Sequence, residues 1–236
     1  MSAILSVEGM NTFYGRAHIL ADVALRVGSG EVVVLLGRNG AGKSTTMKSI
    51  MGLVRPASGR VVFAGAEITG RAPHEIARVG LGYVPEDRRV FTDLTVMENL
   101  SVGRQKPRPG APQWTPERLF TLFPNLAEMR DRPAGRMSGG EQQMLTIART
   151  LMGNPRAILL DEPSEGLAPV IVEHMAQTIR ELKREGLTVV LSEQNLHFAT
   201  FVSDRAYIIE KGRIRFHGTI AELMREDAVR AQYLSV

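Results

Sequence analysis

The chain is built around Gly37-Arg38-Asn39-Gly40-Ala41-Gly42-Lys43-Ser44-Thr45, which follows the apolar run Val32-Val33-Val34-Leu35-Leu36. This stretch fits the pattern G-x-x-x-x-G-K-[ST], so we predict a strand, a phosphate-binding loop and a helix that runs towards Met51. Glycines let such a loop turn tightly and aim its backbone N–H groups at a di- or triphosphate. The pattern predicts that Lys43 reaches the β- and γ-phosphates, that Ser44 places its hydroxyl on Mg²⁺, and that the helix start contributes its positive dipole end.

The composition is that of a globular α/β protein. Its 236 residues, 44% of them hydrophobic, suffice for one α/β domain or for one core with an inserted subdomain. No run approaches the roughly 20 apolar residues that span a bilayer, and the first residues lack the pattern of an export signal, so we expect a cytoplasmic protein. The absence of cysteine excludes disulfides and thiolate metal sites. The formal net charge is +4 without a long basic run, and we expect no nucleic-acid partner.

Short strands are predicted before and after the phosphate loop. Residues 5–8 and 21–27 have the apolar alternation of half-buried strands, and residues 60–63 add another strand to a small antiparallel sheet. Tyr14 lies between the first two strands. Its ring either packs in the core or stacks on a base, and its position alone favours the core.

The middle of the chain changes character and predicts a helical insertion. Thr95-Val96-Met97-Glu98 has capping-box spacing and predicts a helix to about residue 102. Residues 104–116 hold four prolines and are typical of a surface loop, and helix resumes at 117–123. We therefore predict a single domain over 1–236. A helical subdomain at 87–153 separates 1–86, with core strands and the antiparallel β subdomain, from the remaining core at 154–236.

A second capping box opens a longer helix at Ser138-Gly139-Gly140-Glu141. Apolar residues follow it at spacings of three and four, namely Met144, Leu145, Ala148, Leu151 and Met152. A capped helix start with two glycines presents free N–H groups, which makes it a good anion site.

Two acids end the hydrophobic run Ala157-Ile158-Leu159-Leu160-Asp161-Glu162. In a phosphate-loop protein, an aspartate at the tip of the neighbouring strand holds Mg²⁺ directly or through water, and we assign this role to Asp161. Glu162 beside it can polarise a water aimed at the γ-phosphate. The strand at 188–191 ends at the same edge, with Gln194 close behind it. Adjacent acids are a weak signal alone and a strong one when paired with Lys43.

In this order, the phosphate loop, the Ser138–Glu141 helix start and the run ending in Asp161-Glu162 resemble the ATP-binding subunits of ABC transporters across essentially the whole chain. The resemblance implies an α/β fold in which a phosphate-loop ATPase core, RecA-like with a mainly parallel sheet, carries an antiparallel β subdomain and an inserted α-helical subdomain. It also implies hydrolysis of ATP with Mg²⁺. By this resemblance Tyr14 stacks on adenine, and the Ser138 segment closes on ATP held by a second, head-to-tail subunit.

The chain departs from the general family pattern at three positions. Glu86 stands where the family usually has a glutamine that senses Mg²⁺ and the attacking water. Ala168 replaces an aspartate that communicates across the dimer, and Gln194 replaces a histidine that contacts the γ-phosphate. An amide cannot take on charge as an imidazole can. The phosphate loop and both acids are retained, so we expect hydrolysis, with a non-catalytic nucleotide sensor as the alternative.

The same departures indicate a subfamily. Residues 84–91, 164–169 and 192–195 look like the second ATP-binding subunit of high-affinity branched-chain amino-acid importers. That resemblance implies a second ATP-binding subunit, two membrane permeases and, indirectly, a solute-binding protein, with the chain held peripherally on the inner face of the membrane. In the family, the segment here at 87–100 receives a permease helix, and Phe91 either contacts it or packs inside the helical subdomain.

Several other functions stay open. Urea and short-chain amide importers use close relatives of this subunit, so the motifs indicate an ABC importer more specifically than they indicate its solute. Soluble ABC-type ATPases of DNA repair or translation usually carry a coiled-coil insert or tandem domains, which this sequence lacks. A phosphate-loop small-molecule kinase is disfavoured by the helix start at Ser138.

Overall fold

The computed structural model describes residues 3–234 and contains two β-sheets. The larger sheet has six strands in the order β10-β9-β3-β8-β7-β6, and the smaller has four in the order β2-β1-β4-β5. In the six-stranded sheet, β6, β7, β8, β3 and β9 pair in parallel and β10 is antiparallel to β9. The strands of this sheet are β3 (Val32–Leu36), β6 (Leu81–Val84), β7 (Ala157–Asp161), β8 (Thr188–Glu193), β9 (Arg205–Glu210) and β10 (Arg213–Thr219). The smaller sheet holds β1 (Ala3–Tyr14), β2 (Ala17–Gly28), β4 (Ser58–Phe63) and β5 (Ala66–Glu67).

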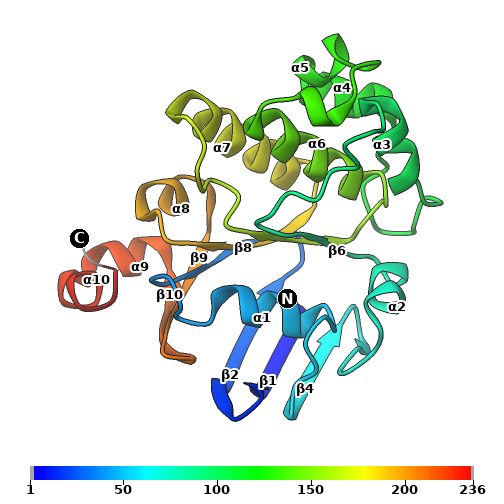
Figure 1. Ribbon diagram of the computed structural model, residues 1–236. Coiled ribbons are helices and arrows are strands. Elements are labelled where there is room, and N and C mark those ends of the chain that lie inside the picture. Colours follow the sequence, from blue (N-terminus) through cyan, green and yellow to red (C-terminus); the bar gives the residue numbers. More distant parts are fainter. Residues whose placement is uncertain (1–2, 235–236) are drawn as a thin grey trace.

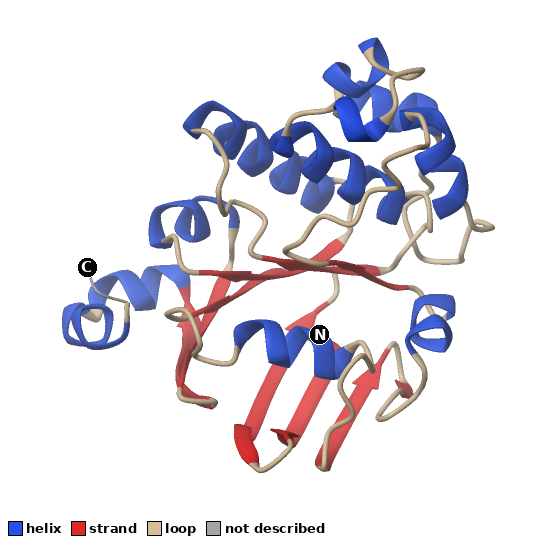
Figure 2. Ribbon diagram, in the orientation of Figure 1, coloured by secondary structure: helices blue, strands red, loops and turns tan. Residues whose placement is uncertain are grey.

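The helices cover both faces of the six-stranded sheet. One group lies above the sheet in Figures 1 and 2, and α1 lies below it, between the two sheets. The helices are α1 (Lys43–Ile50), α2 (Pro73–Arg78), α3 (Val96–Gly103), α4 (Pro116–Leu122), α5 (Pro124–Glu128), α6 (Gly139–Leu151), α7 (Pro169–Arg184), α8 (Leu196–Val202), α9 (Ile220–Arg225) and α10 (Asp227–Tyr233). This architecture confirms the predicted fold class.

Strand β3 shows why both faces of the sheet must be covered. Its five residues are all buried. Val32 and Val34 contribute to the core above the sheet, whereas Val33 and Leu35 contribute to the core between the sheets. Because side chains alternate along a strand, a continuous apolar run is expected where both faces of a parallel sheet are packed. The strand that leads into the phosphate loop is therefore fixed from two sides.

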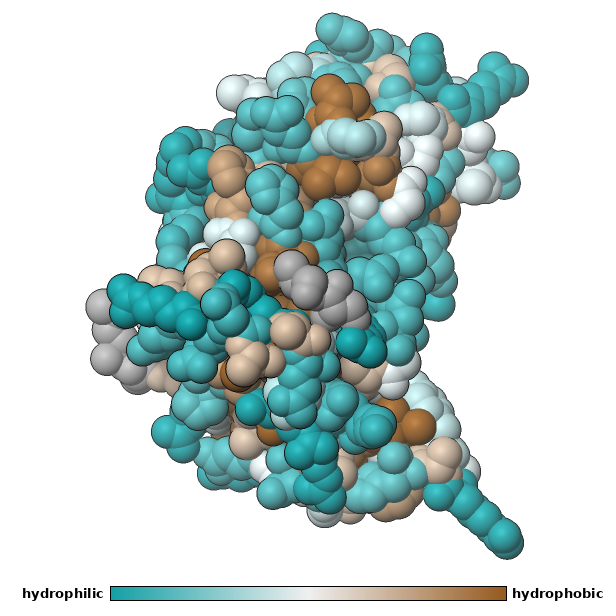
Figure 3. All heavy atoms as spheres, turned by 90° about the vertical axis from the view of Figure 1, so that its left-hand side faces the viewer, coloured by the Kyte–Doolittle hydropathy of each residue, from teal (hydrophilic) through white to brown (hydrophobic). Residues whose placement is uncertain are grey.

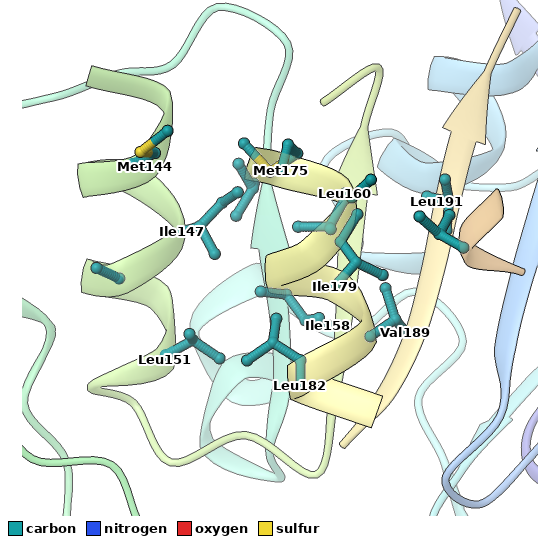
Figure 4. Close-up of a cluster of buried hydrophobic side chains, with 14 of the residues drawn as sticks. Met144, Ile147, Leu151, Ile158, Leu160, Met175, Ile179, Leu182, Val189 and Leu191 are labelled. Atoms are coloured by element: carbon teal, nitrogen blue, oxygen red, sulfur yellow. The ribbon is translucent and has the colours of Figure 1, made fainter. Parts of the chain in front are cut away.

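Helices α6 and α7 pack side by side onto the upper face of the sheet (Figure 4). Both are amphipathic, and their buried side chains meet those of β7 and β8 in one cluster. The side chains labelled in the figure are Met144, Ile147, Leu151, Ile158, Leu160, Met175, Ile179, Leu182, Val189 and Leu191. This packing carries the start of α6 to the same end of the molecule as the ends of the parallel strands.

The first two strands are longer than predicted. Residues 5–8 and 21–27 are only parts of β1 and β2, and Tyr14 is the last residue of β1 rather than part of a connection. Register shifts interrupt the pairing of β1 with β2, and Gly9 and Asp22 have positive φ angles of 59° and 58°. Such bulges break the apolar alternation while the strands stay paired, so the sequence pattern underestimates their length.

The predicted helix starts are confirmed. The Thr95 hydroxyl accepts from the Glu98 N–H at 3.2 Å, and the Glu98 carboxylate accepts from the Thr95 N–H at 2.8 Å. The same reciprocal pair opens α6 at Ser138 and Glu141. Residues 104–116 form the predicted loop up to the start of α4 at Pro116.

The C-terminal segment forms two short helices, α9 and α10, with a break between them. The chain leaves the helical conformation at Glu226, whose φ and ψ are −93° and 70°. The guanidinium of Arg230 donates to the Leu223 and Met224 carbonyls at the end of α9. These bonds satisfy carbonyls that a helix end leaves without intrahelical partners.

The face that carries the C-terminal helices is mostly hydrophilic, and its largest hydrophobic patch lies in the upper part, at the height of α4 to α7, with smaller ones lower down (Figure 3). Within residues 3–234, no helix has both the length and the apolar character needed to cross a membrane.

Candidate active site

The carboxyl ends of three neighbouring strands bring the predicted site together. Strands β3, β8 and β7 are adjacent and parallel, with Leu36 opposite Glu193 and Asp161 opposite Ser192. The phosphate loop follows β3, Glu162 follows β7, and Gln194 follows β8. Open parallel sheets bind ligands outside this edge, and the topology brings the predicted site residues of these three strands together there.

The phosphate loop needs glycine at two positions in particular. Gly42, the residue before α1, has a φ of 113°, and a Cβ there would lie 2.9 Å from a methyl of Leu20. A Cβ on Gly37 would lie 2.5 Å from the Ile209 carbonyl oxygen. Conformation therefore favours glycine at position 42, and lack of space beside the backbone excludes a larger residue at position 37. Arg38, Asn39 and Gly40 are exposed at the loop tip, Ala41 is buried and Thr45 is half-buried.

Lys43 is the first residue of α1 and is buried, with 3% of its side chain exposed. Its ammonium donates to the Gly37 carbonyl at 2.8 Å and to the Arg38 carbonyl at 3.1 Å. It also forms an ion pair with the Glu162 carboxylate at 3.0 Å. A buried ammonium must be paired and hydrogen-bonded. Here its partners are two loop carbonyls and the Glu162 carboxylate, and phosphate oxygens could take their place.

Asp161 is buried at the end of β7 and accepts three hydroxyl hydrogen bonds. Ser44 and Ser192 donate to its Oδ1 at 2.9 and 2.7 Å, and Tyr83 donates to its Oδ2 at 3.0 Å. The bond to Ser44 joins two residues that the sequence predicts to bind Mg²⁺. Ser192 and Tyr83 were not predicted, because they come from strands whose order in the sheet is not evident from sequence.

Glu162 is buried and has a φ of 47°, an unusual conformation for a residue other than glycine. Its N–H donates to the carbonyl and hydroxyl of Ser192 at 3.2 and 3.1 Å, which holds the turn after β7. Its Oε1 faces Lys43, and its Oε2 has no hydrogen-bond partner within residues 3–234. Strained backbone and an unsatisfied buried oxygen are typical of a functional position.

Two further glutamates lie near Glu162. The neighbouring Glu162 carboxylate raises the pKa of the Glu165 carboxyl to about 7, helped by burial and by the charge of Glu86. Burial raises the pKa of Glu193, whose carboxylate accepts from the Ser164 N–H at 3.1 Å. The sequence did not reveal Glu165, because an exposed acid in a turn carries no pattern of its own.

The donor set near the phosphate loop fits magnesium held together with a nucleotide. Across residues 3–234, no three His, Cys, Asp or Glu side chains gather as a metal cluster. Ser44 and Asp161 instead present a hydroxyl and a carboxylate, which are hard oxygen donors. Mg²⁺ commonly takes one or two such protein groups and completes its shell with phosphate oxygens and water.

Among the residues described, no side-chain hydrogen bond joins Ser138 at the start of α6 to this cluster of buried groups. Ser138 is exposed, and its N–H donates to the Glu141 carboxylate at 2.7 Å. Gly140 is buried against α7, where a Cβ would lie 2.9 Å from a methyl of Ile171. The first N–H groups of any helix lack intrahelical acceptors, so this start is available to an anion.

The remaining predicted residues lie at the surface. Tyr14 is 48% exposed at the end of β1, so the interpretation of its ring as core is wrong. Glu86 and Gln194 are exposed just after β6 and β8, and Ala168 is exposed before α7. None of these positions is bonded into the Lys43 and Asp161 cluster by its side chain among the residues described.

A surface groove of about 720 Å³ lies between α2, α3 and the end of α6. Phe91 forms part of its wall and is 47% exposed, with the Arg149 guanidinium 4.8 Å from the ring centroid. Packing of Phe91 inside the helical region is therefore excluded. Arg108, from the proline-rich loop, donates to carbonyls at the ends of α2 and α6 and so joins the two sides of the groove.

The fold and the site together define a phosphate-loop nucleotide-binding protein. The sequence profile of the ABC transporter family matches residues 20–165, which is more than half of the chain. The chain therefore belongs to the ABC transporter family, as one of its ATP-binding subunits. The resemblance drawn from the motifs is confirmed.

Curated relatives extend this similarity over nearly the whole chain. The high-affinity branched-chain amino acid transport ATP-binding protein BraG of Pseudomonas aeruginosa is 46% identical over 98% of this chain and 99% of its own. A probable branched-chain amino acid transport ATP-binding protein, LivF, of Archaeoglobus fulgidus is 37% identical over 95% of both chains. The lipopolysaccharide export system ATP-binding protein LptB of Haemophilus influenzae is also 37% identical, over 98% of this chain and 97% of its own.

Solved structures agree with the sequence relatives. The ADP conformation of an ATP-binding cassette from an ABC transporter matches with a TM-score of 0.83 and 29% identity, covering 98% of both chains. A nucleotide-free cassette from an ABC transporter matches with a TM-score of 0.82, covering 97% of both chains.

Proposed function

We propose that this chain hydrolyses ATP to drive an importer of branched-chain amino acids. The observation that carries the solute class is the 46% identity to BraG over almost the full length of both chains. LivF supports the same class at 37% identity, and the lipopolysaccharide export relative LptB, also at 37%, is less similar to this chain than BraG is. The retained Lys43, Ser44, Asp161 and Glu162 support hydrolysis.

The proposed chemistry is mostly positioning and charge stabilisation. The loop N–H groups and Lys43 hold the β- and γ-phosphates, with Ser44 and Asp161 placed to hold Mg²⁺. When bound, Mg²⁺ neutralises charge on the phosphate oxygens. As the phosphates take over Lys43, the Glu162 carboxylate is released from its ion pair and orients the attacking water. Glu86 and Gln194 border the same edge, where they would face the metal and the γ-phosphate.

The second half of each ATP site comes from a partner in this proposal. The segment from Ser138 to Glu141 would close on ATP held by another ATP-binding subunit in a head-to-tail dimer, with Tyr14 stacked on adenine. Ser138 and Tyr14 are exposed, which is compatible with contacts from outside the chain. When two ATP-binding subunits close on ATP, the free energy of forming the interface between them can drive a movement of the attached permeases.

Two permeases would hold the chain at the inner face of the membrane, with a solute-binding protein acting indirectly. The groove beside Phe91 suits a permease helix, because apolar side chains are exposed there beside polar ones. Leu53, Phe91 and Val102 are each about half exposed along this groove. An exposed apolar patch rimmed by polar groups is typical of a protein interface.

The test is uptake of labelled leucine, with urea in parallel, by cells whose only copy of this chain carries Lys43→Ala. We expect leucine uptake to fall to background while urea uptake is unchanged, because alanine has no ammonium group to hold the β- and γ-phosphates. Lys48→Ala, on the same helix but away from the loop, is the matched control and should transport normally.

Other outcomes would select the alternatives. Loss of urea uptake alone would still support an ATP-driven importer, and it would identify the solute as urea or a short-chain amide. If neither uptake changed, a salt-sensitive shift on DNA or RNA would support a soluble ATPase of nucleic-acid metabolism. Absence of phosphate release from the purified complex would support a nucleotide sensor.

A further inference from the structure

Tyr83 connects a surface groove to the carboxylate that is placed for magnesium. It lies on β6, which pairs in parallel with β7 at the edge of the six-stranded sheet. Its hydroxyl donates to Asp161 Oδ2 at 3.0 Å, and its side chain also forms part of the wall of the groove beside Phe91. The sequence motifs assign no role to Tyr83.

The bond from Tyr83 completes a set of three donors around one carboxylate. Ser44 of α1 and Ser192 of β8 both donate to Oδ1, whereas Tyr83 alone donates to Oδ2 among the residues described. The two serines lie on the side of the phosphate loop and of β8. Only the bond from β6 therefore restrains rotation of the carboxylate through its second oxygen.

The phenol is a dependable donor. A phenol has an ordinary pKa of about 10, so its hydroxyl carries a proton at physiological pH and can donate to the Asp161 carboxylate. Groups that hydrogen-bond a metal-binding carboxylate fix its orientation, and their loss typically weakens metal binding.

We propose that Tyr83 is a positioning residue that holds Asp161 in the orientation required for the magnesium-bound nucleotide. This inference rests on the proposed function, because it needs Asp161 to act on Mg²⁺. The competing account is that the hydroxyl only satisfies a buried carboxylate and stabilises the fold. The two accounts differ in what happens to the magnesium dependence of nucleotide binding.

The experiment uses Tyr83→Phe, which removes the hydroxyl and keeps the ring. Binding of a non-hydrolysable fluorescent ATP analogue to the full chain is measured while Mg²⁺ is varied and again in excess EDTA. We expect the Mg²⁺ concentration for half-maximal enhancement of binding to rise about tenfold. Binding in EDTA should match wild type, which also reports that the variant is folded and that the phosphate loop is intact.

Two controls separate positioning from general effects. Tyr207→Phe removes another hydroxyl, one that accepts from the Arg26 N–H at 3.0 Å and lies away from Asp161, so it should lower stability without moving the magnesium midpoint. Phe91→Ala changes the groove wall but keeps the hydroxyl on Asp161. Its magnesium midpoint should equal that of wild type.

The inference is overturned if Tyr83→Phe has the magnesium midpoint of wild type, or if Tyr207→Phe shifts it equally. A wild-type protein whose nucleotide binding ignores Mg²⁺ would instead overturn the assignment of Ser44 and Asp161, and the inference with it. If the analogue fails to bind wild type at all, the proposed ATPase function itself is wrong.

Discussion

The phosphate-loop region and the start of α6 are prepared for nucleotide to very different degrees. Around the loop, Lys43 and Glu162 have side chains that are 3% and 6% exposed and are already paired. Ser138, at the start of α6, is exposed, and its capping box is formed with Glu141 of the same helix. One region is a preorganised site inside the chain, and the other is a surface that gains a role only when an anion is brought to it.

This difference separates two kinds of mutational effect. A change in the buried cluster should alter chemistry in every state of the protein, because its partners are all internal. A change at the exposed helix start should alter ATP turnover only when a second subunit supplies ATP. The following experiments test that separation.

Glu162→Gln should have the largest effect. The amide can no longer act as a base towards water, so steady-state ATP turnover should fall about 100-fold or more. ATP binding should persist, because the phosphates are held by the loop and Lys43. Gel filtration with ATP and Mg²⁺ should then show a trapped dimer. An unchanged turnover rate would remove Glu162 from the chemistry, and Glu67→Gln, a remote surface change, serves as the control.

Ser138→Ala should have an intermediate effect. Loss of the cap costs about 1 kcal/mol of stability and weakens the anion site at the start of α6. We expect binding of ATP to the monomer to be normal and ATP-dependent dimerisation to weaken, with turnover reduced about tenfold, equivalent to 1.4 kcal/mol. Isothermal titration and light scattering measure the two steps separately.

Thr219→Ala is the matched control for this variant, because Thr219 and Glu222 form the same capping box at α9. It should lose similar stability and keep full turnover. Equal losses of turnover in both variants would show that the effect of Ser138 is only structural.

Glu165→Gln should have the smallest effect, and it concerns stability. A carboxyl whose pKa is raised from 4.5 to about 7 binds its proton more tightly in the folded state. Its contribution to stability is full below pH 4.5 and is lost as the pH rises through about 7. The variant should therefore gain stability relative to wild type as the pH rises through this window. Urea unfolding without nucleotide measures the difference, and a difference independent of pH would contradict the interaction with Glu162.

Much of the site could be predicted because a few patterns have narrow physical meanings. A glycine-rich loop between strand and helix fixes Lys43 and Ser44, and parallel strands must bring Asp161 to the same edge. Capping boxes at Thr95 and Ser138 mark helix starts because, in each, two side chains three residues apart accept from each other's backbone N–H groups. These features depend on neighbours in sequence.

The features that could not be predicted depend on strand order and register. Tyr83 reaches Asp161 only because β6 lies beside β7, and Ser192 does so because β8 lies on the other side. The raised pKa of Glu165 arises from a turn that brings it to Glu162. Bulges in β1 were missed for a related reason, since a local pattern does not report long-range strand pairing.

The ion pair between Lys43 and Glu162 also constrains how this protein can evolve. Replacing either residue alone leaves the other charge buried without its partner, a change that typically costs about 3–5 kcal/mol. A lineage that abandoned catalysis would therefore gain stability by losing both residues together. Retention of both in one chain is the state expected while selection still acts on ATP turnover.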